Sequence, residues 1–337
     1  MKHAILLITL LLVSCTAQDN SVQIGAILPL TGVASISGIA TEHGMRIAVD
    51  ELNANGGLTG KQIDLIVQDS KADPKEGVTA FEQLTELCHV DAVISTLSSV
   101  SLALVPLAEQ KKTPLLFTQA TDPFIVQNNW TVRYYPTAED ESVPLVRLLS
   151  IHSQHPAILY LDDNYGRAIA DLLQHSFPQI IKDPFTIDET DFRIHFEKIR
   201  IADGIVVIGF SSHLVNAFKQ FHELGLNATL FTASTGAIPD VRKTLSDTVY
   251  LGVPAFYFGT RAEQFTHKYQ TRFNSTPDHY AASGYDSIHL LARALEHEPF
   301  VPVDSFEGLL GKTFVNGRDM RVQLLPAEVS EQDIVPI

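Results

Sequence analysis

The chain has 337 residues, of which 45% are hydrophobic and 19% charged, and its formal net charge is −15 at neutral pH. This length allows two domains of ordinary size, and the hydrophobic content is sufficient for a substantial core. The acidic balance argues against a nucleic-acid partner, because binding to phosphates requires a basic face.

The first residues predict export. Lys2 is followed by an apolar run from Ala4 to Val13, which is too short for a comfortable membrane span and is typical of the hydrophobic region of a signal peptide. The run leads into Leu-Val-Ser-Cys, ending at Cys15, which resembles the lipobox of bacterial lipoproteins. We therefore expect residues 1–14 to be a lipoprotein signal peptide, Cys15 to carry the lipid, and residues 15–21 to be a polar tether.

Strand-like and helix-like segments then alternate. Short apolar runs bounded by turn residues predict strands, and apolar residues at helical spacing predict helices. In chain order, the first half is expected to contain strand 22–28, helix 36–55, strand 63–70, helix 74–88, strand 91–96, helix 102–110 and strand 113–118.

The pattern restarts after Pro136. The second half is expected to contain strand 156–161, helices 166–177 and 191–200, strand 204–210, helix 214–226, strand 229–233, helix 280–297 and a hairpin over 311–325 around Asn316-Gly317. This alternation predicts βαβ units and mostly parallel sheets, and its repetition suggests two similar α/β lobes.

Motifs of common enzyme classes are absent from the sequence. It contains no G-x-S-x-G, no phosphate-binding P-loop and no H-E-x-x-H. His152 and His155 lie close together, but no carboxylate or cysteine joins them at the spacing of a metal site. We therefore expect neither an enzyme nor a metal or cofactor site.

The segments IGAILPLTG, GMRIAVDELNANGGLTGKQIDLIVQDSKADPKEGV, QATDPFI, YLDDNYGRA and SGYDSIHLLARAL occur in this order and span nearly the whole mature chain. Together they resemble the branched-chain amino-acid binding proteins, which are type I periplasmic binding proteins of ABC importers. The resemblance implies two Rossmann-like lobes with parallel sheets, joined by three hinge strands, that close on a ligand. It divides the chain into lobe 1 (22–138 and 258–312) and lobe 2 (139–257 and 313–337), with 29–38 as the first cleft loop.

The resemblance also implies site residues in lobe 1. The family holds a ligand carboxylate with a serine at the start of a helix, which corresponds to Ser99, with Ser98 as the alternative register. The same serines could simply be helix N-caps. A threonine shortly before a proline corresponds to Thr121, with Ala120 beside it.

In lobe 2 the resemblance implies that Tyr165, before a glycine, closes the cleft, and that Phe210 is a second aromatic residue at the ligand. Two cleft positions depart from the family: Thr235 is neutral where amino-acid binders usually carry an acid for the ammonium group, and Ser37 stands where some members carry an aromatic residue. A buried ammonium without a partner is costly. Either Asp122 pairs with it, or the ligand is an organic acid, amide or aromatic acid, and the sequence slightly favours the second.

The sequence thus predicts an exported, monomeric, lipid-anchored protein that delivers a small polar or carboxylate-bearing ligand to an ABC permease and needs no cofactor. The alternative is a regulatory or scaffold lipoprotein with a degenerate cleft, such as an activator of peptidoglycan synthases. In a Gram-negative host this alternative gains weight, because Thr16 is not the aspartate that commonly retains lipoproteins in the inner membrane. An exported hydrolase is disfavoured, since no nucleophile and base occur in a recognisable arrangement.

Overall fold

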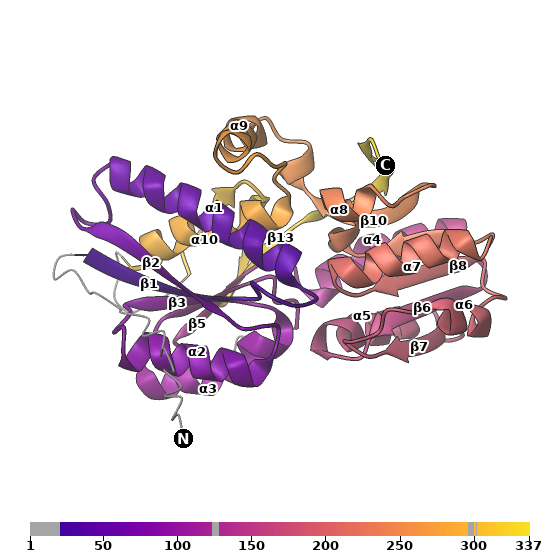
Figure 1. Ribbon diagram of the computed structural model, residues 1–337, viewed down its shortest axis with the longest axis horizontal. Coiled ribbons are helices and arrows are strands. Elements are labelled where there is room, and N and C mark those ends of the chain that lie inside the picture. The colour runs from indigo at the N-terminus through magenta and orange to yellow at the C-terminus, as the bar shows by residue number, and fades with distance from the viewer. Residues whose placement is uncertain (1–20, 123–127, 296–299, 301) are drawn as a thin grey trace, which may run out of the picture.

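Two α/β lobes lie side by side in the computed structural model (Figure 1), which describes residues 21–122, 128–295, 300 and 302–337. The expected signal peptide and the expected lipidation site, Cys15, lie outside the described residues. Within the described part of the chain, no helix combines the length and the apolar character needed to cross a membrane.

Lobe 1 is built on an eight-stranded sheet with the order β11-β12-β13-β5-β4-β3-β1-β2. Its strands are β1 (Ser21–Leu28), β2 (Gln62–Asp69), β3 (Ala92–Thr96), β4 (Leu115–Thr118), β5 (Thr131–Tyr134), β11 (Glu307–Gly308), β12 (Gly311–Asn316) and β13 (Asp319–Val322). The strands from β2 through β13 are parallel, and β12 and β11 are antiparallel additions. One face is covered by α1 (Ser35–Ala54) and α10 (His279–Leu295) and the other by α2 (Pro74–Glu86) and α3 (Ser98–Lys111), while α9 (Arg261–Phe273) packs outside α1 (Figure 1).

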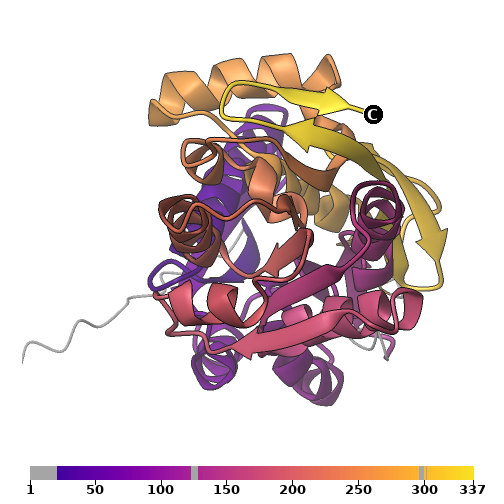
Figure 2. The ribbon, with the colours of Figure 1, turned by 90° about the vertical axis from the view of Figure 1, so that its right-hand side faces the viewer.

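Lobe 2 is built on a seven-stranded sheet with the order β15-β14-β10-β9-β8-β6-β7. Its strands are β6 (Pro156–Leu161), β7 (Ile181–Phe185), β8 (Gly204–Ile208), β9 (Thr229–Thr232), β10 (Val249–Pro254), β14 (Leu324–Val329) and β15 (Ile334–Pro336). Its helices are α4 (Ala138–His152), α5 (Asn164–Ser176), α6 (Arg193–Lys198), α7 (Ser211–Glu223), the short α8 (Pro239–Arg242) and the 3₁₀ turn η1 (Ser234–Ala237). In Figure 2, which looks onto this lobe, the yellow C-terminal strands form one edge of its sheet.

The predicted α/β class, the two-lobe arrangement and the hairpin at Asn316-Gly317 are confirmed. Several elements were not predicted, above all α4, α9, β7 and β10. Helix α4 buries Leu145, Leu148 and Leu149 at helical spacing but contains Pro144, a residue that usually interrupts a helix. Strand β7 carries a lysine, an aspartate and a proline within five residues and so lacks the apolar pattern of a strand.

The chain crosses between the lobes three times. The crossings lie between β5 and α4, at the end of β10, where the turn η2 (Ala255–Tyr257) begins, and between β13 and β14. The first two agree with the expected divisions within a few residues. The third does not: the expected division at residue 312 falls inside β12, and residues 311–322 belong to the sheet of lobe 1. The physical reason is that β13 pairs in parallel with β5, a partner almost 190 residues away that the local pattern does not reveal.

A buried arginine secures this pairing. Arg133 on β5 is fully buried and donates to both carboxylate oxygens of Asp319 on β13, at 2.9 and 2.8 Å. Its remaining nitrogen donates to the carbonyl oxygens of Ala120 and Asp122, in the loop that follows β4. One side chain therefore joins two of the crossing segments to a loop at the cleft.

We predict that Arg133→Met lowers the free energy of unfolding by about 3–5 kcal/mol, the usual cost of removing one partner from a buried ion pair. The substitution removes the cation beside Asp319 and the donors to two carbonyl oxygens while nearly preserving volume. Urea unfolding followed by circular dichroism measures the loss. Arg147→Met, at an exposed position of α4, is the control, and an equal loss in both variants would contradict the prediction.

Candidate functional site

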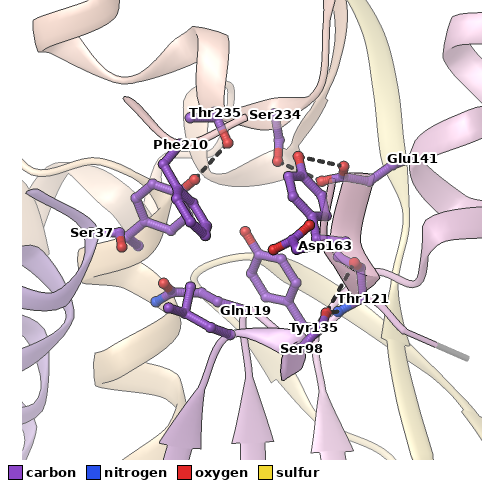
Figure 3. Close-up of a pocket in the computed structure, with 13 residues that line it drawn as sticks. Ser37, Ser98, Gln119, Thr121, Tyr135, Glu141, Asp163, Phe210, Ser234 and Thr235 are labelled. Carbon is purple, nitrogen blue, oxygen red and sulfur yellow. Dashed lines mark hydrogen bonds between the residues drawn. The ribbon is translucent and has the colours of Figure 1, made fainter. Parts of the chain in front are cut away.

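A cavity lies between the lobes at the carboxyl ends of their parallel strands (Figure 3). The empty space between its lining atoms, including the open solvent at its mouth, is about 450 Å³. The 13 described residues that line it are Ser37, Leu97, Ser98, Gln119, Thr121, Tyr135, Glu141, Asp163, Tyr165, Phe210, Ser234, Thr235 and Tyr280. Most of them follow directly after β3, β4, β5, β6, β8 or β9, the position at which open parallel sheets bind ligands.

The N-terminus of α3 contributes hydrogen-bond donors to this cavity. Ser98 is the first residue of the helix, so the N–H groups of the first turn have no partner within the helix. The Ser98 hydroxyl oxygen accepts from the N–H groups of Thr121 and Asp122, at 3.0 and 3.2 Å, and lies 3.4 Å from the Thr121 hydroxyl. This arrangement of hydroxyls at a helix N-terminus suits a carboxylate.

Two residues at the floor of the cavity have left-handed backbones. Leu97, just before α3, has a φ of 67°, and Gln119, just after β4, has a φ of 55°. Residues other than glycine rarely adopt such angles, and each instance costs about 1–3 kcal/mol. The surrounding packing holds both, since Leu97 and Gln119 are almost completely buried.

A buried carboxylate faces the cavity from lobe 2. Glu141 lies in the first turn of α4 and is only 2% exposed. Its Oε1 accepts from the Ser234 hydroxyl at 2.8 Å, and its Oε2 accepts from the Tyr165 hydroxyl at 3.4 Å (Figure 3). Burial raises the pKa of Glu141 to about 7, although both hydrogen bonds act in the opposite direction.

A second carboxylate lies at the start of α5. Asp163 is the N-cap of this helix and accepts from the N–H of Gly166 at 2.9 Å. Burial raises the pKa of Asp163 to about 6, against the effect of its backbone hydrogen bonds.

The charges of the cavity are one-sided. None of the 13 described lining residues is lysine, arginine or histidine, whereas two are acidic. A buried carboxylate is stabilised when a cation pairs with it. Tyr135, Tyr165 and Phe210 add aromatic rings to the lining, and Figure 3 labels Tyr135 and Phe210. The cavity is therefore suited to a small molecule that carries a positive group.

The structure brings six of the residues expected at the ligand together around this cavity: Ser37, Ser98, Thr121, Tyr165, Phe210 and Thr235. Ser98 rather than Ser99 lies at the cavity, so the alternative register is the one that the geometry favours. Ala120 is fully buried but is not among the described lining residues, and its carbonyl accepts from Arg133.

Asp122 is also outside the described lining of the cavity. Its carboxylate accepts from the Asn164 side chain at 3.1 Å, which makes it a bridge between the lobes. Further hydrogen bonds join the lobes. Thr235 and Tyr280 share one at 2.7 Å, the Ser212 hydroxyl donates to the Val33 carbonyl at 3.0 Å, and Arg321 of β13 donates to both carboxylate oxygens of Asp140 in α4, at 2.8 and 2.6 Å. The lobes are thus in direct contact around the cavity.

Sequence reasoning missed the other seven described lining residues, which are Leu97, Gln119, Tyr135, Glu141, Asp163, Ser234 and Tyr280. Glu141 belongs to an acidic run at a helix start, Glu139 to Glu141, which by itself indicates only a favourable interaction with the helix dipole. Glu141 reaches the cavity because α4 begins directly after the chain crosses from lobe 1 to lobe 2, and the local sequence pattern does not reveal this crossing. Among the described residues, no three histidine, cysteine or acidic side chains are grouped as a metal site requires.

Comparison with known proteins places the chain among binding proteins. The profile of a family described as periplasmic binding proteins matches residues 21–305. A Leu/Ile/Val-binding protein of Rhizobium johnstonii is 25% identical over 223 residues, and an amino acid binding protein of Pseudomonas aeruginosa is 25% identical over 234 residues. These alignments cover 62% and 65% of this chain and 60% and 62% of the relatives, so the chain matches somewhat less than two thirds of their length.

Solved structures share the whole fold. The branched-chain amino-acid binding protein LivJ of Streptococcus pneumoniae, in complex with isoleucine, has a TM-score of 0.85 and 22% identity, with 93% of this chain and 97% of that chain covered. A binding protein of Rhodopseudomonas palustris in complex with benzoate also has a TM-score of 0.85, with 16% identity and coverage of 94% and 95%. The chain therefore belongs to the periplasmic binding protein family, and its two-lobed α/β fold is the type I fold of the branched-chain amino-acid binding proteins.

Proposed function

We propose that this protein is an exported substrate-binding protein of an ABC importer and that it binds an α-amino acid between its lobes. The observation that carries the proposal is Glu141, a carboxylate 2% exposed at a cavity whose described lining contains no basic side chain. A ligand ammonium would supply the missing charge, and burial of the pair away from water would strengthen it.

The other half of an amino acid fits the opposite side of the cavity. The first turn of α3, with the hydroxyls of Ser98 and Thr121, would hold the α-carboxylate. Thr235 is neutral, but Glu141 accepts a hydrogen bond from the adjacent Ser234 and would pair with the ammonium. The sequence favoured a ligand without an ammonium group because the neutral Thr235 left that group without a partner. Glu141 would be such a partner.

The relatives support the same class of ligand, since the names of two of them specify Leu/Ile/Val or amino acid binding. The benzoate complex shows that the same fold also accepts an acid without an ammonium, which makes the acidic cavity the deciding feature. We further propose that the chain is lipid-anchored through Cys15, acts as a monomer and presents its closed form to a permease.

The first prediction concerns the ammonium. In titration calorimetry, an L-amino acid is expected to bind much more tightly than the deaminated acid of the same carbon skeleton. Glu141→Gln should weaken amino-acid binding by about 30-fold or more, which corresponds to the 2–5 kcal/mol typical of a buried charge pair that loses one partner. Glu139→Gln, in the same helix turn but outside the described cavity lining, is the matched control.

Equal affinity for both compounds would show that the ammonium is not recognised, and the proposed ligand class would then be wrong. If no small molecule binds to folded protein free of co-purified ligand, the regulatory or scaffold alternative takes its place.

The second prediction concerns pH. Because the pKa of Glu141 is about 7 in the empty protein, its carboxylate is mostly ionised at higher pH and mostly protonated at lower pH. A ligand ammonium binds the ionised form, so the apparent dissociation constant should rise about tenfold between about pH 8 and about pH 6. Calorimetry at both pH values measures this change, and Glu141→Gln should flatten it. A dissociation constant that falls toward acidic pH would contradict the assignment.

A further inference from the structure

The cavity has a second polar end, away from Glu141 and from the first turn of α3, where the ammonium and the α-carboxylate of the ligand are proposed to bind. Gln119 lies there, close to Ser37 and away from Glu141 (Figure 3). The residue is only 7% exposed, and its amide oxygen Oε1 is buried without a hydrogen-bond partner. A buried acceptor left unpaired is costly, so its presence at a ligand cavity calls for a donor.

The orientation of the Gln119 amide follows from its neighbours. Its nitrogen Nε2 donates to the hydroxyls of Thr41 and Ser283, the latter at 3.2 Å. The Thr41 hydroxyl donates its own proton to the Ser37 carbonyl at 2.7 Å, and the Ser283 hydroxyl donates to the Tyr280 carbonyl at 2.8 Å. Both hydroxyls can therefore only accept from Gln119. The amide nitrogen must then face Thr41 and Ser283, and the amide oxygen must face away from these two hydroxyls.

The close packing of α1 against α10 maintains this arrangement. A Cβ atom on Gly44 would lie 1.9 Å from the Ala281 carbonyl oxygen, and one on Gly284 would lie 2.2 Å from the Thr41 carbonyl oxygen. Thr41 and Ser283 are fully buried between these helices. Two rigid helices thus hold the hydroxyls that orient the amide.

The neighbouring hydroxyl of Ser37 has the same hydrogen-bonding character. It donates its proton to the Ala34 carbonyl at 2.9 Å, so toward a ligand it can only accept. Gln119 and Ser37 therefore present two acceptors at this end of the cavity. An aliphatic group would leave them unpaired, and a carboxylate would repel them.

We propose that this end of the cavity selects amino acids whose side chain carries a hydrogen-bond donor, a hydroxyl, amide or ammonium group, over the aliphatic side chains named in the relatives. The inference rests on the proposed function, because it assumes that an α-amino acid occupies the cavity. Gln119 is its specificity-determining residue, and Thr41 and Ser283 are positioning residues.

Isosteric ligands test the proposal in the unaltered protein. Titration calorimetry compares L-threonine with L-valine and L-asparagine with L-leucine, pairs that share a branched shape and differ in donors. The donor-bearing member of at least one pair is expected to bind at least tenfold more tightly, in line with the discrimination shown by sites built around a polar group.

A variant then assigns the selectivity to one residue. Gln119→Met preserves the length of the side chain and removes the acceptor, and it should reduce the ratio within the pair to about threefold or less by weakening the donor-bearing member. Gln83→Met, at an exposed position of α2, is the control and should leave the ratio unchanged.

Valine or leucine binding as tightly as its partner in the unaltered protein would overturn the inference while the proposed function stands. An unchanged ratio in a folded Gln119→Met variant would overturn the role of Gln119. If no α-amino acid binds, the proposed function fails and the inference fails with it.

Discussion

The buried side chain of Arg133 connects the parts of this protein that have to act together. It pairs with Asp319 across two strands that lead into the hinge, and it also holds the carbonyl oxygens of Ala120 and Asp122 beside the cavity. Guanidinium is the side-chain group with enough donors in one plane to serve a carboxylate and backbone carbonyls at once. The position of Thr121, and with it the proposed carboxylate site, therefore depends on the same contact that sets the third crossing between the lobes.

Under the proposed function, Glu141 would supply from α4 the acid that the lobe 2 loop lacks. The lobe 2 loop carries the neutral Thr235, but the first turn of α4 brings Glu141 to the neighbouring Ser234. The hydroxyls of Ser234 and Tyr165 donate to the Glu141 carboxylate and fix its position, while burial raises its pKa.

Sequence reasoning reached the fold and about half of the cavity, for identifiable reasons. Alternating apolar runs and helical periodicity are local signals, and they placed the strands and helices. The family resemblance assigned Thr121, Tyr165 and Phe210 to the cleft, and Ser98 as the alternative to Ser99. The hairpin was found from Asn316-Gly317, but its sheet was not, because strand pairing across the chain leaves no local pattern. Gln119 could not be recognised either, since its role arises from hydroxyls on two distant helices.

The left-handed backbones of Leu97 and Gln119 have a consequence for the thermodynamics of recognition. Each raises the free energy of the folded chain, yet each is held by packing that exists before any ligand arrives. The atoms that meet the ligand in lobe 1 are thus ordered during folding rather than during binding. Little conformational entropy is then lost when a ligand enters, so a molecule with few atoms can still be retained.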